Sequence, residues 1–260
     1  QKRIALTNTT ETGVELWVLE LENGSVSKLT ESNLNSNIGS VINWFSDSEN
    51  MLVKMISNNR RPLIDTDKIV PDGPTISTNF GEKAQNRTYQ DLLKNKFDEH
   101  NFEQLSTSTI YKVSIDGSVK KWMDDGMYRT ISFSPNGEYV MISQINKPFS
   151  YLVTYSRFPT ETNIYNKDGD FVSNLQKVPL IEELPKGFMS VRTGKISFSW
   201  RSDKGASLTY VTALDSGDPS KKVDFRDEVY ELNYPFSGKG KFILKTCLLY
   251  TSPSPRDRQE

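Results

Sequence analysis

A repeated strand–turn–strand pattern limits most strongly how this chain can fold. Three segments, at 41–55, 130–142 and 197–211, each contain an apolar strand, a polar turn and a second apolar strand. In the middle copy, Pro135 of the turn fixes φ at the first corner, and the following Asn136 and Gly137 tolerate positive φ. The pattern predicts antiparallel hairpins.

A second kind of hairpin alternates with the first. It recurs at 14–29, 110–122 and 162–175, where alternating apolar residues flank Asn-Gly or Asp-Gly turns. Two hairpins in succession make a four-stranded antiparallel unit, and repetition of such units is typical of a β-propeller. We therefore predict an all-β fold: a partial β-propeller of about three to four blades of four antiparallel strands. Such a fragment would have an unpaired sheet edge and an uncovered apolar side.

One segment interrupts the repeat. Trp44 and Phe133 occupy equivalent positions in two copies, but they are too far apart for adjacent uninterrupted blades. Between them, residues 58–106 lose the strand alternation and contain several prolines, and residues 88–104 have apolar side chains at steps of three and four. We predict a short helical insertion at about 58–106.

Composition narrows the classes of partner. The 32 Lys and Arg nearly balance the 33 Asp and Glu, so no basic surface for a phosphate backbone is indicated. No run of about 18 apolar residues is present to span a membrane. We expect neither a nucleic-acid partner nor a membrane partner.

The strand pattern stops at Cys247, the only cysteine. Residues 247–257 read CLLYTSPSPRD, which is one translated frame of a common sequencing-library adapter. We expect residues 1–246 to be an N-terminal β-propeller fragment, cut within a domain, and residues 247–260 to be a non-native tail. The alternative is a natural proline-rich tail. Without Cys247 the chain would have no disulfide or thiolate chemistry.

Several short motifs resemble the propeller region of the glutamyl endopeptidases, a branch of the prolyl oligopeptidase family. They are PDGPTI at 71–76, QNRTYQDLLK at 85–94, KPFSY at 147–151, RFP at 157–159, PLIEELP at 179–185, WRSD at 200–203 and DSGDP at 215–219. The resemblance covers roughly residues 13–246. Small departures are Lys195-Ile196 after Gly194, where the family would have Pro-Arg, and Gly205, where it would have Pro.

The resemblance implies a parent serine peptidase with an N-terminal propeller and a C-terminal α/β-hydrolase domain that carries a Ser-His-Asp triad. No G-x-S-x-G motif occurs in this chain, so no catalytic residue is assigned to it and the fragment should be inactive. The implied function is a non-catalytic propeller that gates peptide substrates for cleavage, after Glu. The partners implied are peptides and the missing hydrolase domain, and the family suggests a periplasmic or extracellular location. The alternatives are a freestanding propeller scaffold or the propeller of a dipeptidyl-peptidase relative.

Metal and cofactor sites are not expected. His100 is the only histidine and lies between Glu99 and Asn101 in the helical segment, which favours a surface or capping role over a catalytic base. One histidine and one cysteine cannot form a zinc site. Three loop carboxylates invite a calcium interpretation but lack the required spacing and are more simply solvated: Asp65, Asp67 and Asp72.

Arginines outside the strands are the candidate substrate-binding residues. A peptidase that selects an acidic side chain needs a fixed cation, and a guanidinium binds carboxylates through two hydrogen bonds. From the five such arginines, Arg60, Arg61, Arg87, Arg157 and Arg192, we assign substrate binding to Arg87, Arg157 and Arg192. The simpler alternative for each is a surface ion pair. The aromatic residues Phe149, Tyr151, Tyr155 and Phe158 could form a ligand platform, but we expect them in the blade core.

Overall fold

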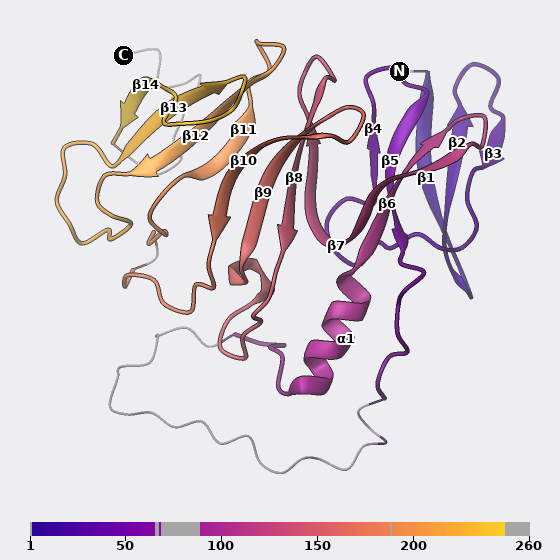
Figure 1. Cartoon of the computed structure of the whole chain (residues 1–260), viewed down its shortest axis with the longest axis horizontal. Helices are drawn as coiled ribbons and strands as arrows, with labels where there is room; N and C mark the ends of the chain where they lie inside the picture. Colours follow the sequence, from indigo (N-terminus) through magenta and orange to yellow (C-terminus); the bar gives the residue numbers. More distant parts are fainter. Residues whose placement is uncertain (1, 66–67, 69–88, 188, 248–260) are drawn as a thin grey trace.

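The computed structural model describes residues 2–65, 68, 89–187 and 189–247 of the chain. Its strands form sheets that stand side by side, from β1–β3 at the right of Figure 1 to β11–β14 at the left. One helix, α1 (Lys96–Ser106), lies below the strands in Figure 1. The predicted all-β partial propeller with a short helical insertion is confirmed.

The strands divide into four consecutive antiparallel units, which we call blades 1 to 4. Blade 1 contains β1 (Arg3–Thr10), β2 (Gly13–Glu20) and β3 (Val26–Lys28). Blade 2 contains β4 (Ile42–Trp44), β5 (Asn50–Ile56), β6 (Ser108–Ser114) and the first half of β7 (Val119–Phe133). Blade 3 contains the second half of β7, then β8 (Tyr139–Ile145), β9 (Thr160–Asn166) and β10 (Phe171–Val178). Blade 4 contains β11 (Ile196–Trp200), β12 (Ser207–Ala213), β13 (Asp227–Asn233) and β14 (Lys241–Thr246).

The long strand β7 connects the two central blades. Its first part pairs with β6, up to Gly126 opposite Ser108, and its second part pairs with β8, from Met127 opposite Ile145. The sheet order is therefore continuous from β10 to β4. Sequence analysis located both hairpins but did not show that a single strand belongs to two blades.

Apolar residues on both faces of the inner strands hold the blades together. On β5, Met51 and Val53 face a cluster with Leu16 of blade 1, whereas Leu52 packs on the blade 3 side with Ile131. Successive side chains of a strand point to opposite faces, so a strand between two neighbours must be apolar at consecutive positions. This explains the unbroken apolar run Met51-Leu52-Val53. A third cluster joins blade 3 to blade 4 and includes Ile164, Leu208, Tyr210 and Phe236.

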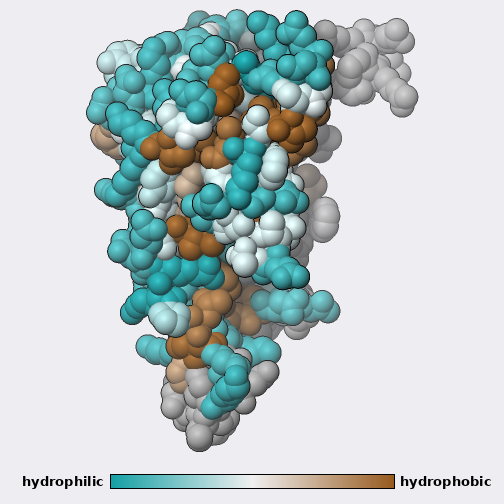
Figure 2. Space-filling model, turned by 90° about the vertical axis from the view of Figure 1, so that its right-hand side faces the viewer, coloured by the Kyte–Doolittle hydropathy of each residue, from teal (hydrophilic) through white to brown (hydrophobic). Residues whose placement is uncertain are grey.

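Blade 1 differs from the other blades in having three strands. Within the described part of the chain, β1 pairs with β2 alone. Ile4, Leu6 and Val26 of this sheet remain 37%, 43% and 52% exposed. Figure 2, which views the molecule from this side, shows hydrophobic patches among hydrophilic residues. An open sheet edge and an uncovered apolar side were expected from the incomplete repeat.

The helix is shorter than the sequence spacing predicted. We expected helical structure over 88–104, but α1 begins only at Lys96. Asn95 is its N-cap, and the Asn95 side chain accepts hydrogen bonds from the backbone N–H groups of Phe97 and Asp98. Asp91 has φ of 55°, which a continuous right-handed helix cannot contain. The apolar residues at 89–93 instead belong to an irregular segment, and Tyr89 and Leu93 pack against the same apolar cluster as Phe102 of the helix.

A buried lysine lies between blades 2 and 3. Lys54 of β5 is 2% exposed, and its Nζ donates hydrogen bonds to the carbonyl oxygens of Ile38 and, at 3.4 Å, Tyr128. Desolvation of the ammonium lowers the pKa of Lys54 to about 8. The amine therefore ties the 34–41 segment to blade 3, but burial of its charge opposes folding at neutral pH.

Replacing this lysine should change how stability depends on pH. The pKa of Lys54 is lower in the folded state, so from pH 8 to 10.5 the unfolded chain binds more protons and folding becomes more favourable as pH rises. Relative to Lys54→Met, the free energy of unfolding of the native chain should rise by about 3 kcal/mol over this interval. Urea unfolding at several pH values measures the difference. The exposed Lys120→Met is the control, and parallel pH curves for the native chain and Lys54→Met would refute the assignment.

Candidate functional site

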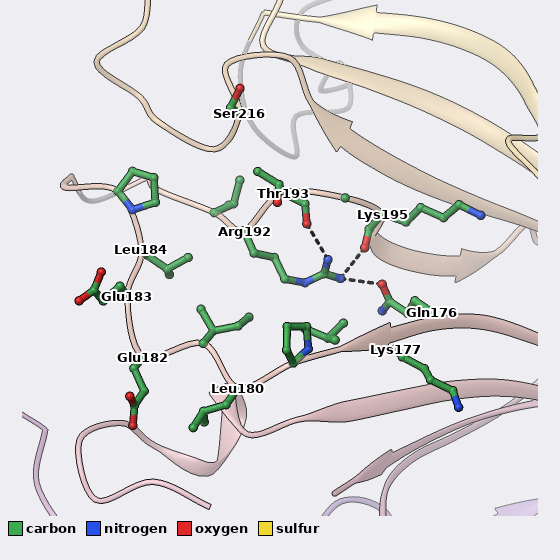
Figure 3. Close-up of a pocket in the computed structure, with 16 residues that line it drawn as sticks. Gln176, Lys177, Leu180, Glu182, Glu183, Leu184, Arg192, Thr193, Lys195 and Ser216 are labelled. Atoms are coloured by element: carbon green, nitrogen blue, oxygen red, sulfur yellow. Dashed lines mark hydrogen bonds between the residues drawn. The ribbon is translucent and has the colours of Figure 1, made fainter. Parts of the chain in front are cut away.

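A cavity lies between the end of blade 3 and the start of blade 4. It has a volume of about 560 Å³ and is formed by the segment after β10, at 178–185, the segment before β11, at 191–195, and Ser216 (Figure 3). Much of its wall is apolar, from Pro179, Ile181 and Val191, and Arg192 crosses it. We call this cavity the Arg192 pocket.

Neutral oxygens fix the guanidinium of Arg192. Its Nη1 donates to the carbonyl oxygen of Thr193 at 2.9 Å, and its Nη2 donates to Oε1 of Gln176 at 2.8 Å and to the carbonyl oxygen of Lys195. These bonds connect the 191–195 segment to Gln176 near the end of strand β10, as Figure 3 shows. Because the planar fork is held from several directions, the cation has a defined position in the pocket.

A tight turn at Ser216-Gly217 forms the upper side of the pocket. Asp215 is 1% exposed; its Oδ1 accepts a hydrogen bond from the N–H of Gly217 at 2.7 Å, and its Oδ2 lies 2.7 Å from Nε of Arg226. Gly217 has φ of 79°, and a Cβ there would lie 1.9 Å from the carbonyl oxygen of Val191. Glycine is therefore required where the turn meets the 191–195 segment. The DSGDP motif therefore forms a structural turn.

The two lysines beside the pocket are directed elsewhere. Nζ of Lys195 donates to the carbonyl oxygen of Gly238 at 2.7 Å and lies 5.0 Å from the ring centre of Tyr210. Burial lowers the pKa of Lys195. Nζ of Lys177 lies 3.3 Å from Oε1 of Glu161. Of these three cations, Arg192 is the one whose side chain crosses the pocket in Figure 3.

The other candidate arginines lie in different environments. Arg157 is in the short 3₁₀ helix η2 (Tyr155–Arg157), and its guanidinium lies 5.4 Å from the ring centre of Tyr89. Its carbonyl oxygen accepts a hydrogen bond from the N–H of Ile181 in the wall of the Arg192 pocket, at 3.0 Å. Arg87 lies outside the described residues. Nη2 of Arg61 is 4.0 Å from Oε2 of Glu103, a surface ion pair.

Sequence reasoning did not identify most of the pocket wall. The PLIEELP segment was singled out as a motif, but its residues were not assigned to a site. Its run of prolines and apolar residues, neither strand nor helix, was the available signal. That it faces the 191–195 segment depends on how blades 3 and 4 pack.

The aromatic residues expected in the blade core divide between core and rim. Phe158 is buried in a cluster with Ile145 of β8, as expected, and Phe149 packs against this cluster. Both rings also meet Phe102 of α1 edge to face, with ring centres 5.6 and 5.1 Å from it.

The expectation is wrong for the two tyrosines. Tyr155 is exposed, and the hydroxyl of Tyr151 donates a hydrogen bond to Glu99 of α1 at 2.5 Å, which raises the pKa of Tyr151 to about 12. They follow β8 in a segment that packs beside the helix rather than inside a blade.

His100 contacts a backbone carbonyl group, which is a structural role. It lies on α1, and its Nε2 is 3.0 Å from the carbonyl oxygen of Pro62, so a ring N–H at this nitrogen can donate to it. Among the described residues, no group of three or more His, Cys, Asp and Glu side chains is arranged to hold a metal. No helix in the same residues is long and apolar enough to cross a membrane. Asp67, Asp72 and the 248–260 tail lie outside the described residues.

Arg192→Ala should loosen the pocket. It removes three hydrogen bonds from a charged donor, each contributing on the order of 1.5–3 kcal/mol in favourable settings. Amide hydrogen exchange in residues 191–195 should accelerate at least about tenfold. Arg192→Lys, which keeps the charge but not the fork, should give an intermediate rate. The matched control is Lys177→Ala on the same wall; equal rates in the two alanine variants would show that Arg192 does not hold the segment.

Comparisons with known proteins agree with the fold and the motifs. No family model matches the chain. It is 36% identical over 259 residues to a probable chloroplastic glutamyl endopeptidase of Oryza sativa subsp. japonica, covering 97% of this chain and 27% of that protein. For the protein of the same description in Arabidopsis thaliana the identity is 34%, over 88% of this chain and 24% of the relative. The chain thus spans about a quarter of the length of these relatives.

Two solved structures also match the chain, both at low sequence identity. An acylaminoacyl peptidase, in complex with a chloromethyl ketone, is 11% identical with a TM-score of 0.49, covering 94% of this chain and 30% of that one. The β-propeller domain of the Trilobed protease from Pyrococcus furiosus is 10% identical with a TM-score of 0.45, covering 94% and 54%. From its four blades and its sequence identity to the plant proteins, we identify the chain as a β-propeller segment related to the glutamyl endopeptidases.

Proposed function

We propose that this propeller segment is the non-catalytic, substrate-sorting part of a serine peptidase that cleaves peptides after Glu. The observation that carries the proposal is the Arg192 pocket: a cavity of about 560 Å³ with a guanidinium held by three oxygen acceptors. The names of the plant relatives support a glutamate preference for the whole protein. A separate α/β-hydrolase domain would supply the nucleophile.

Arg192 offers a fixed cation to an acidic side chain of an extended peptide, and the two carboxylates that also line the cavity, Glu182 and Glu183, point away from it (Figure 3). A cation that is already fixed loses little conformational freedom when a carboxylate approaches it. The walls from Pro179, Ile181 and Val191 would cover the methylene groups of a glutamate. In this proposal Arg192 contributes electrostatic attraction, and Arg157, whose backbone supports the wall, contributes further positive charge at the same end of the propeller. Arg87 would act with them.

The size of the cavity supports a sorting role. A cavity of about 560 Å³ has room for one side chain of an extended peptide, and most side chains of a folded protein are not presented in this way. We therefore propose that the propeller selects short or unfolded peptides and keeps folded proteins from the catalytic domain. Chemistry would take place entirely in that domain.

Charge reversal in the pocket should remove a preference for acidic peptides. The probe is a labelled octapeptide with one central Glu among neutral residues, together with its Gln counterpart, and fluorescence anisotropy measures binding to the 260-residue chain. We expect the native chain to bind the Glu peptide about tenfold more tightly, and Arg192→Glu to abolish or invert the difference. Arg157→Glu should reduce it less.

The control for this experiment is Lys120→Glu, an exposed charge on blade 2 that is outside the pocket. It matches the change in net charge without altering the site. Equal binding of the two peptides by the native chain, or the same loss of preference in the control, would reject the proposed acidic-residue site.

A further inference from the structure

A second cavity lies where α1 meets the segment that follows β8. It has a volume of about 270 Å³, and we call it the Phe102 pocket. Its apolar lining consists of Leu92, Leu93, Phe102, Val153, Tyr155 and Phe158. Neither the proposed peptidase activity nor the arginine assignments use this cavity.

The cavity has a buried floor and an open rim. Val153 and Phe158 are 1% and 2% exposed, whereas Tyr155 is 46% exposed. Phe102 meets Phe158 edge to face, with ring centres 5.6 Å apart and an interplanar angle of 86°. An aromatic ring of a ligand can pack favourably against the edges and faces of such a pair.

Local backbone contacts hold the segment that forms one side of the cavity. Asp91 adopts φ of 55°, a left-handed conformation that aspartate tolerates better than most residues. The N–H of Lys94 donates to Oδ2 of Asp98 at 2.8 Å, and Asn95 caps the helix. These contacts tie the segment to the start of α1 beside the cavity.

The Phe102 pocket and the Arg192 pocket lie near each other. Leu180 lines the Arg192 pocket and packs on the apolar cluster that contains Phe158 of the Phe102 pocket. Beside it, the N–H of Ile181 donates to the carbonyl oxygen of Arg157, two residues beyond Tyr155. This backbone hydrogen bond joins segments that line the two cavities, so we expect one extended peptide to reach both.

We propose that the Phe102 pocket is a second peptide subsite, which receives a phenylalanine or leucine side chain of the peptide whose acidic residue enters the Arg192 pocket. An apolar cavity of about 150 Å³ holds a benzene molecule, so 270 Å³ accommodates a benzyl or isobutyl group. This inference rests on the proposed function for its occupant. It adds an apolar requirement at a defined spacing from the acidic residue.

The test uses the labelled Glu octapeptide with one Phe placed two, three or four residues before or after the Glu. An extended peptide advances about 3.3–3.6 Å per residue, so one placement should match the separation of the pockets. That peptide should bind at least about tenfold more tightly than its Phe→Ala version, the gain expected for burying one large apolar side chain. Binding to the 260-residue chain is measured by anisotropy.

Substitutions in the lining of the Phe102 pocket test whether the gain in affinity from Phe arises there. Leu92→Trp, which fills the cavity from a half-buried position, should remove the gain from Phe but keep the preference for Glu over Gln. Tyr155→Ala, which removes part of the rim, should reduce the gain. The matched control is Leu152→Ala. Leu152 is 61% exposed and lies next to Val153 in the sequence, but it does not line the cavity. This variant should bind the peptides as the native chain does.

The possible results separate the two proposals. If Glu is preferred but no Phe placement improves binding, or if the gain survives Leu92→Trp, the second subsite is refuted and the acidic site remains. If Phe binds at this cavity without any preference for Glu, the apolar subsite stands and the acidic-residue site fails. Circular dichroism confirms that each variant is folded, and Tyr155→Ala provides an independent result if Leu92→Trp fails to fold.

Discussion

Face-to-face packing of antiparallel sheets is the constraint on which the rest of this structure depends. Each interior blade buries apolar side chains on both faces, so Leu52 packs on blade 3 while its neighbours Met51 and Val53 pack on blade 1. Strand β7 strengthens this arrangement because one continuous strand pairs with β6 in blade 2 and with β8 in blade 3. Loops at the blade ends are then held at fixed separations, and it is these loops that form both cavities.

Polar groups buried within this packing have specific structural roles. The ammonium of Lys54 donates hydrogen bonds to two carbonyl oxygens between blades 2 and 3. Asp215 holds the turn above the Arg192 pocket through its contacts with Gly217 and Arg226. Burial without a partner would be costly, so each such group specifies one arrangement of nearby backbone. The same logic applies to Arg192: its hydrogen bonds hold the 191–195 segment, and the fixed cation that results is the basis of the proposed acidic-residue site.

The helical insertion extends this scheme at the end of the blades. Phe102 of α1 packs on Phe149 and Phe158 from the segment after β8, so the helix is held by aromatic contacts with blade 3 rather than by its own propensity. Its apolar side completes one cavity, and the cluster beneath it reaches Leu180 in the wall of the other. A peptide-binding role for this end of the propeller would use both cavities together.

The sequence alone determined the hairpins, because alternation of apolar residues and Asn-Gly or Asp-Gly turns are local properties of the chain. It also indicated the family, through motifs such as WRSD and PLIEELP. It could not place the start of α1, which depends on the capping by Asn95 and the backbone of Asp91, nor the aromatic residues after β8, whose partner Phe102 is more than 40 positions away. Only the tertiary structure brought residues 178–185 opposite residues 191–195, because a pocket between blades depends on how the sheets pack, and that information lies in no single segment.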